Sequence, residues 1–149
     1  MGISYKANIN ISGIKGKINR AAAKALERML LEEKTLIAYR TQKGLSIDNQ
    51  RWRSPYDKYS EAYAKQRKKE RRQVNPPDLT RTGQMLGSMT TEVKQKGSQL
   101  IGRIFFSNTK AAKKARGNLE YRKFFGLSAK RKREIIQEIR NLFGQYNNG

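Results

Sequence analysis

The sequence predicts an α+β fold, in which a long N-terminal helix and a C-terminal helix pack on a small antiparallel sheet. Apolar and polar side chains alternate over residues 3–12 and again over residues 90–106, which is the period of a strand. Over residues 17–42 and 128–143 the apolar positions instead follow the period of an amphipathic helix. The length of 149 residues fits a single domain that spans residues 1–149.

The predictions of the first strand and of the long helix each depend on an apolar stripe. In the strand, one side carries Ile3, Tyr5, Ala7, Ile9 and Ile11. In the helix, the predicted buried stripe consists of Ile18, Ala22, Ala25, Met29 and Leu36, widened by Leu26, Leu30 and Ile37. Gly44 follows this helix and suits a C-terminal cap.

The middle of the chain is more polar. A short helix is expected to start at Pro55, and two basic segments, at about 66–78 and 107–121, are expected to be mobile loops because they contain little apolar area. Thr82 is expected to cap a second short helix that runs through Leu86 and ends with the help of Ser88.

A hairpin and a final helix complete the chain. The hairpin turns at Lys96-Gly97, and its second strand is apolar on both sides, which predicts a central position in the sheet. Ser128 is expected to cap the last helix, whose predicted buried face consists of Ile135, Ile136, Ile139, Leu142 and Phe143.

The composition argues against several classes of function. The chain has no Cys and no His, so disulfides, thiol catalysis and His-dependent catalysis are excluded. Three scattered Asp residues and no convergent set of titrating groups predict that the protein is not an enzyme and holds no cofactor and no metal. No apolar run is long enough to span a membrane and no secretory signal pattern is present, so a cytoplasmic origin without membrane contact is expected.

The charge points to an anionic partner. Thirty-three Lys and Arg residues against 12 Asp and Glu residues give a formal net charge of +21. Charge of this size is most easily explained by nucleic acid, then by an acidic protein surface, and least by an anionic membrane. Three clusters carry much of it: Arg67, Lys68, Lys69, Arg71 and Arg72; Lys110, Lys113, Lys114 and Arg116; and Lys130, Arg131, Lys132 and Arg133.

Each cluster is either a solvated face or a contact to DNA or to an acidic partner. The third cluster favours a contact, because it lies in the first turns of the last helix, where the helix dipole disfavours cations. Replacing Lys130 to Arg133 with Ser is therefore expected to stabilise the isolated monomer slightly and to weaken assembly. Tyr56, Tyr59 and Tyr63 could stack on bases, but their helical spacing favours a core or a subunit interface.

Four motifs occur in a recognisable order. They comprise Trp52 before Ser-Pro-Tyr; Tyr59 to Lys65; Leu79, Arg81, Thr82, Gly83, Leu86, Ser88 and Met89; and Arg122, Phe124, Phe125, Gly126, Leu127 and Ser128. Over roughly residues 15–143 this order resembles the tailed-bacteriophage virion morphogenesis proteins, also called tail completion proteins. Lys123 departs from the pattern, because the family has Pro before the aromatic residue.

The resemblance implies a structural protein of the virion. Members of that family complete the tail or lie in the neck between tail and head, usually as rings. The resemblance therefore implies that this chain forms a homo-oligomeric ring, expected to be a hexamer. The implied partners are other neck and tail proteins and DNA passing through the lumen, with assembly in the bacterial host cytoplasm. In this reading Leu79, Leu86 and Met89 anchor a small helix, and Arg81 could reach a partner. The alternative is a free basic factor that binds nucleic acid without reading its sequence.

Overall fold

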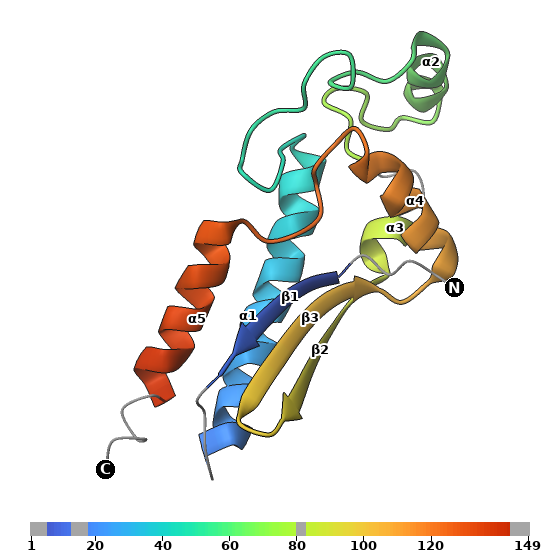
Figure 1. Cartoon of the computed structure of the whole chain (residues 1–149). Coiled ribbons are helices and arrows are strands. Elements are labelled where there is room, and N and C mark those ends of the chain that lie inside the picture. Colours follow the sequence, from blue (N-terminus) through green and yellow to red (C-terminus); the bar gives the residue numbers. More distant parts are fainter. Residues whose placement is uncertain (1–5, 13–17, 80–82, 144–149) are drawn as a thin grey trace.

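A sheet with helices on one face confirms the predicted α+β fold. The computed structural model describes residues 6–12, 18–79 and 83–143. The elements are β1 (Lys6–Ile11), α1 (Ile18–Gln42), α2 (Glu61–Lys69), α3 (Gln84–Gly87), β2 (Met89–Lys96), β3 (Gln99–Phe106), α4 (Thr109–Leu119) and α5 (Ala129–Phe143). Figure 1 shows α1 lying along the sheet and α5 beside it.

The sheet has the order β1-β3-β2, and both pairings are antiparallel. The central position of β3 confirms the prediction made from its two apolar sides. Leu100, Ile104 and Phe106 are buried, whereas the side chains between them are half-buried. The predicted hairpin is also confirmed, and Gly97 with φ +61° occupies its turn. In β1, Ala7, Ile9 and Ile11 are buried, while Ile3 and Tyr5 lie outside the described residues.

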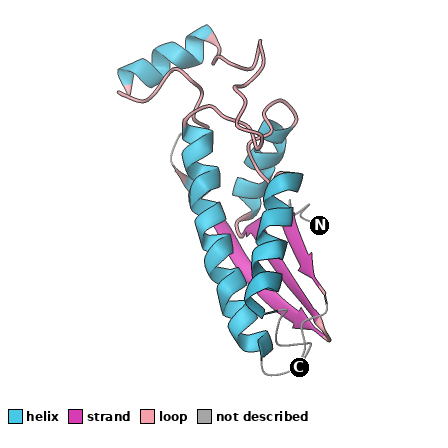
Figure 2. Cartoon of the chain, turned by 90° about the vertical axis from the view of Figure 1, so that its left-hand side faces the viewer, coloured by secondary structure: helices cyan, strands magenta, loops and turns pink. Residues whose placement is uncertain are grey.

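Helix α1 packs closely against the sheet at Gly102. A Cβ atom at this position would lie 2.9 Å from Cδ1 of Leu30 and 3.1 Å from Cδ2 of Leu26. Because Gly102 has no side chain, the two leucines pack directly on the backbone of β3. Figure 2 shows α1 and α5 running alongside each other next to the sheet, with the core between these layers.

The stripe of α1 is largely as predicted. Its buried apolar side chains are Ala22, Leu26, Met29, Leu30 and Ile37. Leu36 was predicted to be buried, but 47% of it is exposed, because it lies about 100° around the helix from Ile37. Gly44 ends the helix with φ +73°, and the amide of Leu45 donates to the carbonyl of Arg40 at 3.0 Å, which confirms the predicted cap.

Helix α5 begins and packs largely as predicted. The Ser128 hydroxyl accepts a hydrogen bond from the amide of Arg131 at 3.1 Å, so Ser128 is the predicted cap. Ile135 and Ile139, one turn apart, are fully buried. The prediction for Leu142 is wrong, since 51% of this residue is exposed on the outer side of the helix.

The loop predicted over 107–121 is wrong, because most of this segment is helix α4. Asn108 caps it, and its Oδ1 accepts from the amides of Lys110 and Ala111 at 2.8 and 3.2 Å. Ala111 and Ala115 are buried, which gives the helix an inner face of small residues. The cap and this pair of alanines at i and i+4 outweigh the polar composition on which the loop was predicted.

The predicted helix at Pro55 and loop over 66–78 also need correction. Pro55 lies in a turn, and α2 starts at Glu61 after Ser60, whose hydroxyl accepts from the amide of Tyr63 at 3.4 Å. Helix α2 continues to Lys69, so the loop begins only afterwards and returns along residues 70–79. We call residues 45–79 the α2 lobe, which lies beyond the C-terminal end of α1 (Figures 1 and 2).

The short helix α3 follows the α2 lobe. Its N-cap position is occupied by Gly83, with φ +76°. Thr82, the predicted cap, and Arg81 lie outside the described residues. The Ser88 hydroxyl donates to the carbonyl of Met85 at 3.0 Å, and Ser88 ends the helix as predicted.

Candidate functional site

The motif residues meet where the α2 lobe joins the rest of the chain. Trp52 is buried, and its Nε1 donates to the carbonyl of Pro77 at 3.1 Å. Leu79 is half-buried with φ +55°, and Leu86 and Met89 are buried in the core. The Trp52–Pro77 hydrogen bond therefore joins the start of the α2 lobe to its returning loop, 25 residues later, and Leu86 and Met89 follow this loop into the core. Lys65 does not take part, because it is exposed on α2.

Arg67 is the centre of the α2 lobe, although the sequence placed it in a basic cluster that is either a solvated face or a contact to DNA or to an acidic partner. Only 1% of it is exposed. Its guanidinium pairs with Oδ1 of Asp78 at 2.8 Å and donates through Nε to the carbonyl of Gln73 at 2.6 Å. The guanidinium carbon also lies 4.8 and 5.6 Å from the ring centres of Tyr59 and Tyr63. This arginine therefore ties α2 to the loop that follows it.

Tyr59 supports the same site through its hydroxyl. The hydroxyl oxygen accepts from the amides of Asp78 and Leu79 at 3.1 and 3.0 Å and lies 3.1 Å from Oδ1 of Asp78, to which it donates. Burial, and then the negative charge of Asp78, raise the pKa of Tyr59 to about 12. The spacing of Tyr59 and Tyr63 predicted a core or a subunit interface, and the two rings in fact pack edge to face around Arg67.

A pH titration tests this hydroxyl. The folded-state pKa of about 12 lies above the ordinary value of 10.0, so the unfolded chain loses the Tyr59 proton first. Its contribution to stability is complete below pH 10 and is lost as the pH rises through 12. Tyr59→Phe is therefore expected to be less stable than the wild type at pH 8, with a difference that shrinks between pH 10 and 12. Urea unfolding across this range measures it. An exposed control, Tyr39→Phe, should follow the wild type, and a constant difference for Tyr59→Phe would contradict the assignment.

The last motif connects the body to the lobe from the other side. Arg122 donates to the carbonyls of Tyr56 and Lys58 at 2.7 and 3.5 Å. Arg40, on α1, donates to the carbonyls of Phe124 and Gly126 at 3.3 and 3.4 Å. Gly126 adopts φ +133°, and the motif phenylalanines and Leu127 are buried. We call this set of contacts, together with those of Trp52 and Tyr59, the joint.

The three basic clusters differ sharply in the structure. In the first, Arg67 is buried, Arg72 pairs with Glu70 at 3.0 Å, and Lys68, Lys69 and Arg71 are exposed. In the third, Arg131 pairs with the buried carboxylate of Glu33 and with Glu134, Lys130 lies 4.0 Å from Glu134, Lys132 is half-buried and Arg133 is exposed. The second cluster, on α4, is exposed throughout, and no ion pair involves it within the described ranges.

The anomaly of cations at the start of α5 has an internal explanation. The sequence suggested that an external anion compensates them, but Glu33 of α1 and Glu134 of α5 supply negative charge next to Arg131. The sequence contains a signal for the burial of Glu33, because this residue lies on the same stripe of α1 as Leu30 and Ile37. Arg67 offered no comparable signal, since its burial depends on a loop that folds back to it.

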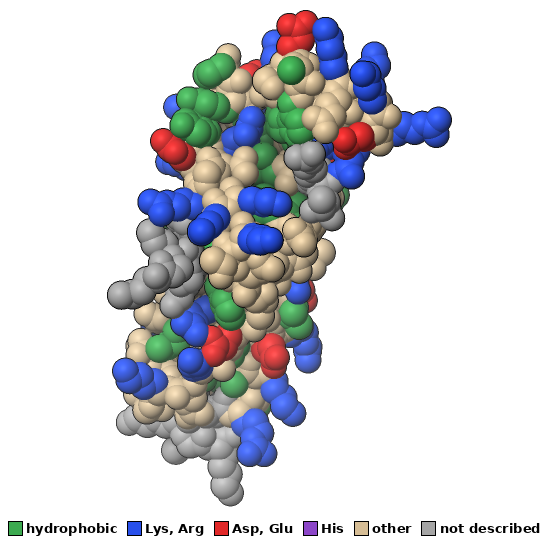
Figure 3. Space-filling view, turned by 90° about the vertical axis from the view of Figure 1, so that its right-hand side faces the viewer, with side chains coloured by type: hydrophobic (Ala, Val, Ile, Leu, Met, Phe, Trp, Pro, Cys, Tyr) green, Lys and Arg blue, Asp and Glu red, His purple; other side chains and the backbone are tan. Residues whose placement is uncertain are grey.

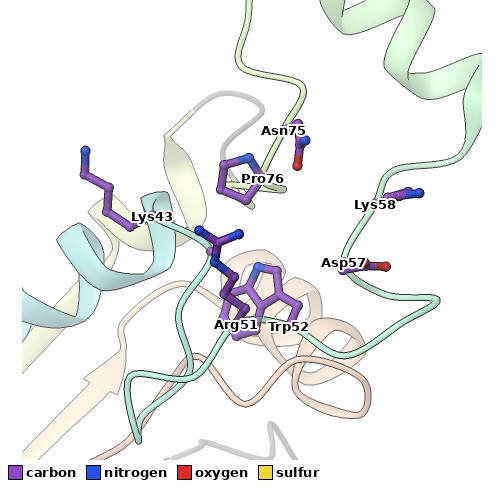
Figure 4. Close-up of a pocket in the computed structure, with 8 residues that line it drawn as sticks. Lys43, Arg51, Trp52, Asp57, Lys58, Asn75 and Pro76 are labelled. Atoms are coloured by element: carbon purple, nitrogen blue, oxygen red, sulfur yellow. The ribbon is translucent and has the colours of Figure 1, made fainter.

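A pocket of about 340 Å³ opens beside the joint and is shown in Figure 4. It is lined by Lys43, Gly44, Arg51, Trp52, Asp57, Lys58, Asn75 and Pro76. The charged ends of Lys43, Arg51 and Lys58 do not converge in it, and the Lys43 nitrogen lies 5.5 Å from the ring centre of Tyr39. Such a lining offers no set of groups that could act together on a substrate.

The described residues contain no group of three His, Cys, Asp or Glu side chains that could hold a metal ion. Within the same residues, every helix is too short or too polar to cross a lipid bilayer. Searches of protein-family models, of curated proteins and of solved structures found no match to this chain.

Proposed function

We propose that this chain is a structural virion protein of a tailed phage. It would be a tail completion or neck component that forms a ring and either joins the tail to the head or closes the tail end. The observation that carries the proposal is the joint, in which residues of all four resembling motifs make internal contacts. Motifs that build a framework rather than a reactive centre suit a protein that acts by assembling.

A ring needs a surface on which the next copy can pack. Four large apolar residues on α1 and α5 are 45–59% exposed: Leu31, Leu36, Tyr39 and Leu142. Leu36 and Tyr39, with Leu45 and Ile47, line a groove of about 370 Å³ between α1 and the start of α5. In a cyclic assembly this groove would receive a different surface of the neighbouring copy, because head-to-tail contacts close into rings.

The ring is tested with Leu36→Glu combined with Tyr39→Ser. This variant is expected to remain folded and to be monomeric, whereas the wild type forms rings, because it removes apolar area that the neighbouring copy would bury. Light scattering after gel filtration and negative-stain electron microscopy measure the state. Tyr121→Ser, which changes a residue that is 46% exposed and lies outside the groove, should retain the rings. A wild type that stays monomeric at every concentration would contradict the proposal.

The alternative function is a free, sequence-tolerant nucleic-acid-binding factor. The net charge of +21 and the exposed cations of α4 favour it. It predicts a monomer that binds random DNA tightly, with an affinity that falls steeply as salt is added. Rings without such tight binding by the monomer favour the virion role.

A further inference from the structure

We infer that the outer face of α4 is a contact surface for the phosphate backbone of double-stranded DNA. We call this surface the α4 face, and it consists of Lys110, Lys113, Lys114, Arg116 and Gly117. The inference deepens the proposed function and rests on it, because a neck or tail ring would surround the DNA that the face contacts. It selects one of the three basic clusters and one class of partner.

The first argument is charge compensation. The other two clusters include cations that are paired with Glu or Asp within the chain, as Arg67 and Arg131 are. Residues 108–119 contain no acidic residue at all. No ion pair reaches the α4 face in the part of the chain that the structure describes. Its charge is therefore left for an external anion.

The second argument is the direction of the helix. Lys110 lies in the first turn of α4, near the positive end of the helix dipole, and only Arg116 lies in the last turn. Cations near a helix N-terminus destabilise the helix, and a bound anion reverses that effect. The isolated chain thus bears an unfavourable arrangement that contact with phosphate would relieve.

The third argument is Gly117. Glycine disfavours a helix, yet Gly117 lies within α4 on its exposed side. A Cβ atom built at Gly117 would have no heavy atom within 4 Å, apart from its chain neighbours and the backbone of its own helix. Packing within the chain would therefore allow a side chain at this position. Lys113 and Lys114 precede it by one turn, and the missing side chain leaves room for a phosphodiester chain to approach the helix backbone between them.

The fourth argument separates DNA from an acidic protein. The large apolar side chains that are exposed lie on α1, α5 and around the joint, and none of those identified lies on α4. Protein interfaces are enriched in aromatic anchors and depleted in Lys, whereas phosphate contacts need only cations and donors. Figure 3 shows Lys and Arg side chains standing out from the part of the surface where α4 lies and from the α2 end.

The test compares two triple variants that remove the same charge. Lys110→Gln, Lys113→Gln and Lys114→Gln together change the α4 face, and Arg20→Gln, Lys24→Gln and Arg28→Gln change an exposed stripe on α1. Fluorescence anisotropy with a random 30-bp duplex gives the affinity at several salt concentrations. The α4 variant is expected to bind at least ten-fold more weakly, and its slope of log K against log salt should fall by about 2–3. The α1 variant should lose far less.

A second variant tests the close approach. Gly117→Ala is expected to raise the melting temperature while weakening DNA binding several-fold, so its two effects have opposite signs.

Equal losses in both triple variants, unchanged binding in the α4 variant, or displacement of DNA by polyglutamate as readily as by competing DNA would each overturn the inference. Electron microscopy of the same samples reports ring formation separately. Absent rings would therefore reject the proposed function, whereas rings with unaltered DNA binding would reject only the α4 face.

Discussion

Arg67→Leu is expected to lower the free energy of unfolding by about 3–5 kcal/mol, because it breaks a buried ion pair by removing one of its two charges. Asp78, which pairs with Arg67 at 2.8 Å, is itself 8% exposed. The substitution also leaves the carbonyl of Gln73 without its 2.6 Å donor. The α2 lobe should then lose the contacts between α2 and its returning loop, and limited proteolysis should cut within residues 45–79 before the rest of the chain.

Urea unfolding of the wild type and of Lys68→Leu provides the comparison. Lys68 is the exposed neighbour of Arg67 on α2, and its loss should change stability by no more than about 0.5 kcal/mol. Arg67→Leu combined with Asp78→Leu should recover part of the loss, because no charge is then left buried. If Arg67→Leu and Lys68→Leu unfold at the same urea concentration, Arg67 does not hold the lobe.

Arg131→Ser is expected to lower the free energy of unfolding by about 2–3 kcal/mol, at the low end for a buried pair because Arg131 is 32% exposed. Its partner, the carboxylate of Glu33, is only 2% exposed and lies on the inner side of α1. This expected loss of stability is opposite to the effect of the helix dipole alone. From the dipole alone, removing cations from the start of α5 would stabilise the monomer.

Arg133→Ser is the matched control, because Arg133 lies on the same turns of α5 and is exposed. It should leave the unfolding midpoint nearly unchanged. Thermal unfolding followed by circular dichroism measures both variants. A monomer stabilised by Arg131→Ser would show that the dipole, rather than Glu33, dominates the energetics of this residue.

The sequence predicted best what depends on local periodicity. The stripe of α1, the cap at Ser128 and the central position of β3 could all be predicted, because each follows from a spacing or a neighbouring residue. Helix α4 also has local signals in the sequence, which are Asn108 and the alanines at 111 and 115, but the polar composition of the same segment predicts a loop.

The parts that could not be predicted depend on contacts between distant segments. Arg67 reads as one of five cations in a polar run until the loop after α2 brings Asp78 to it. Arg122 and Arg40 find their acceptors 66 and 84 residues away, at the carbonyls of Tyr56 and Phe124. No pattern within a window of one helix or strand contains that information. The Arg67–Asp78 and Arg131–Glu33 pairs also join distant segments, and they distinguish the first and third basic clusters from the cluster on α4.

The acceptors at the joint have a consequence for how the sequence can diverge. Arg122 and Arg40 bind carbonyl oxygens of residues 56, 58, 124 and 126 rather than their side chains. A main-chain oxygen is present whichever amino acid occupies the position, and it does not titrate. Homologues could therefore differ at positions 56 and 58 and retain the attachment, provided that the two arginines persist. The arginines, and not the residues that they contact, are the identities by which remote relatives would be found.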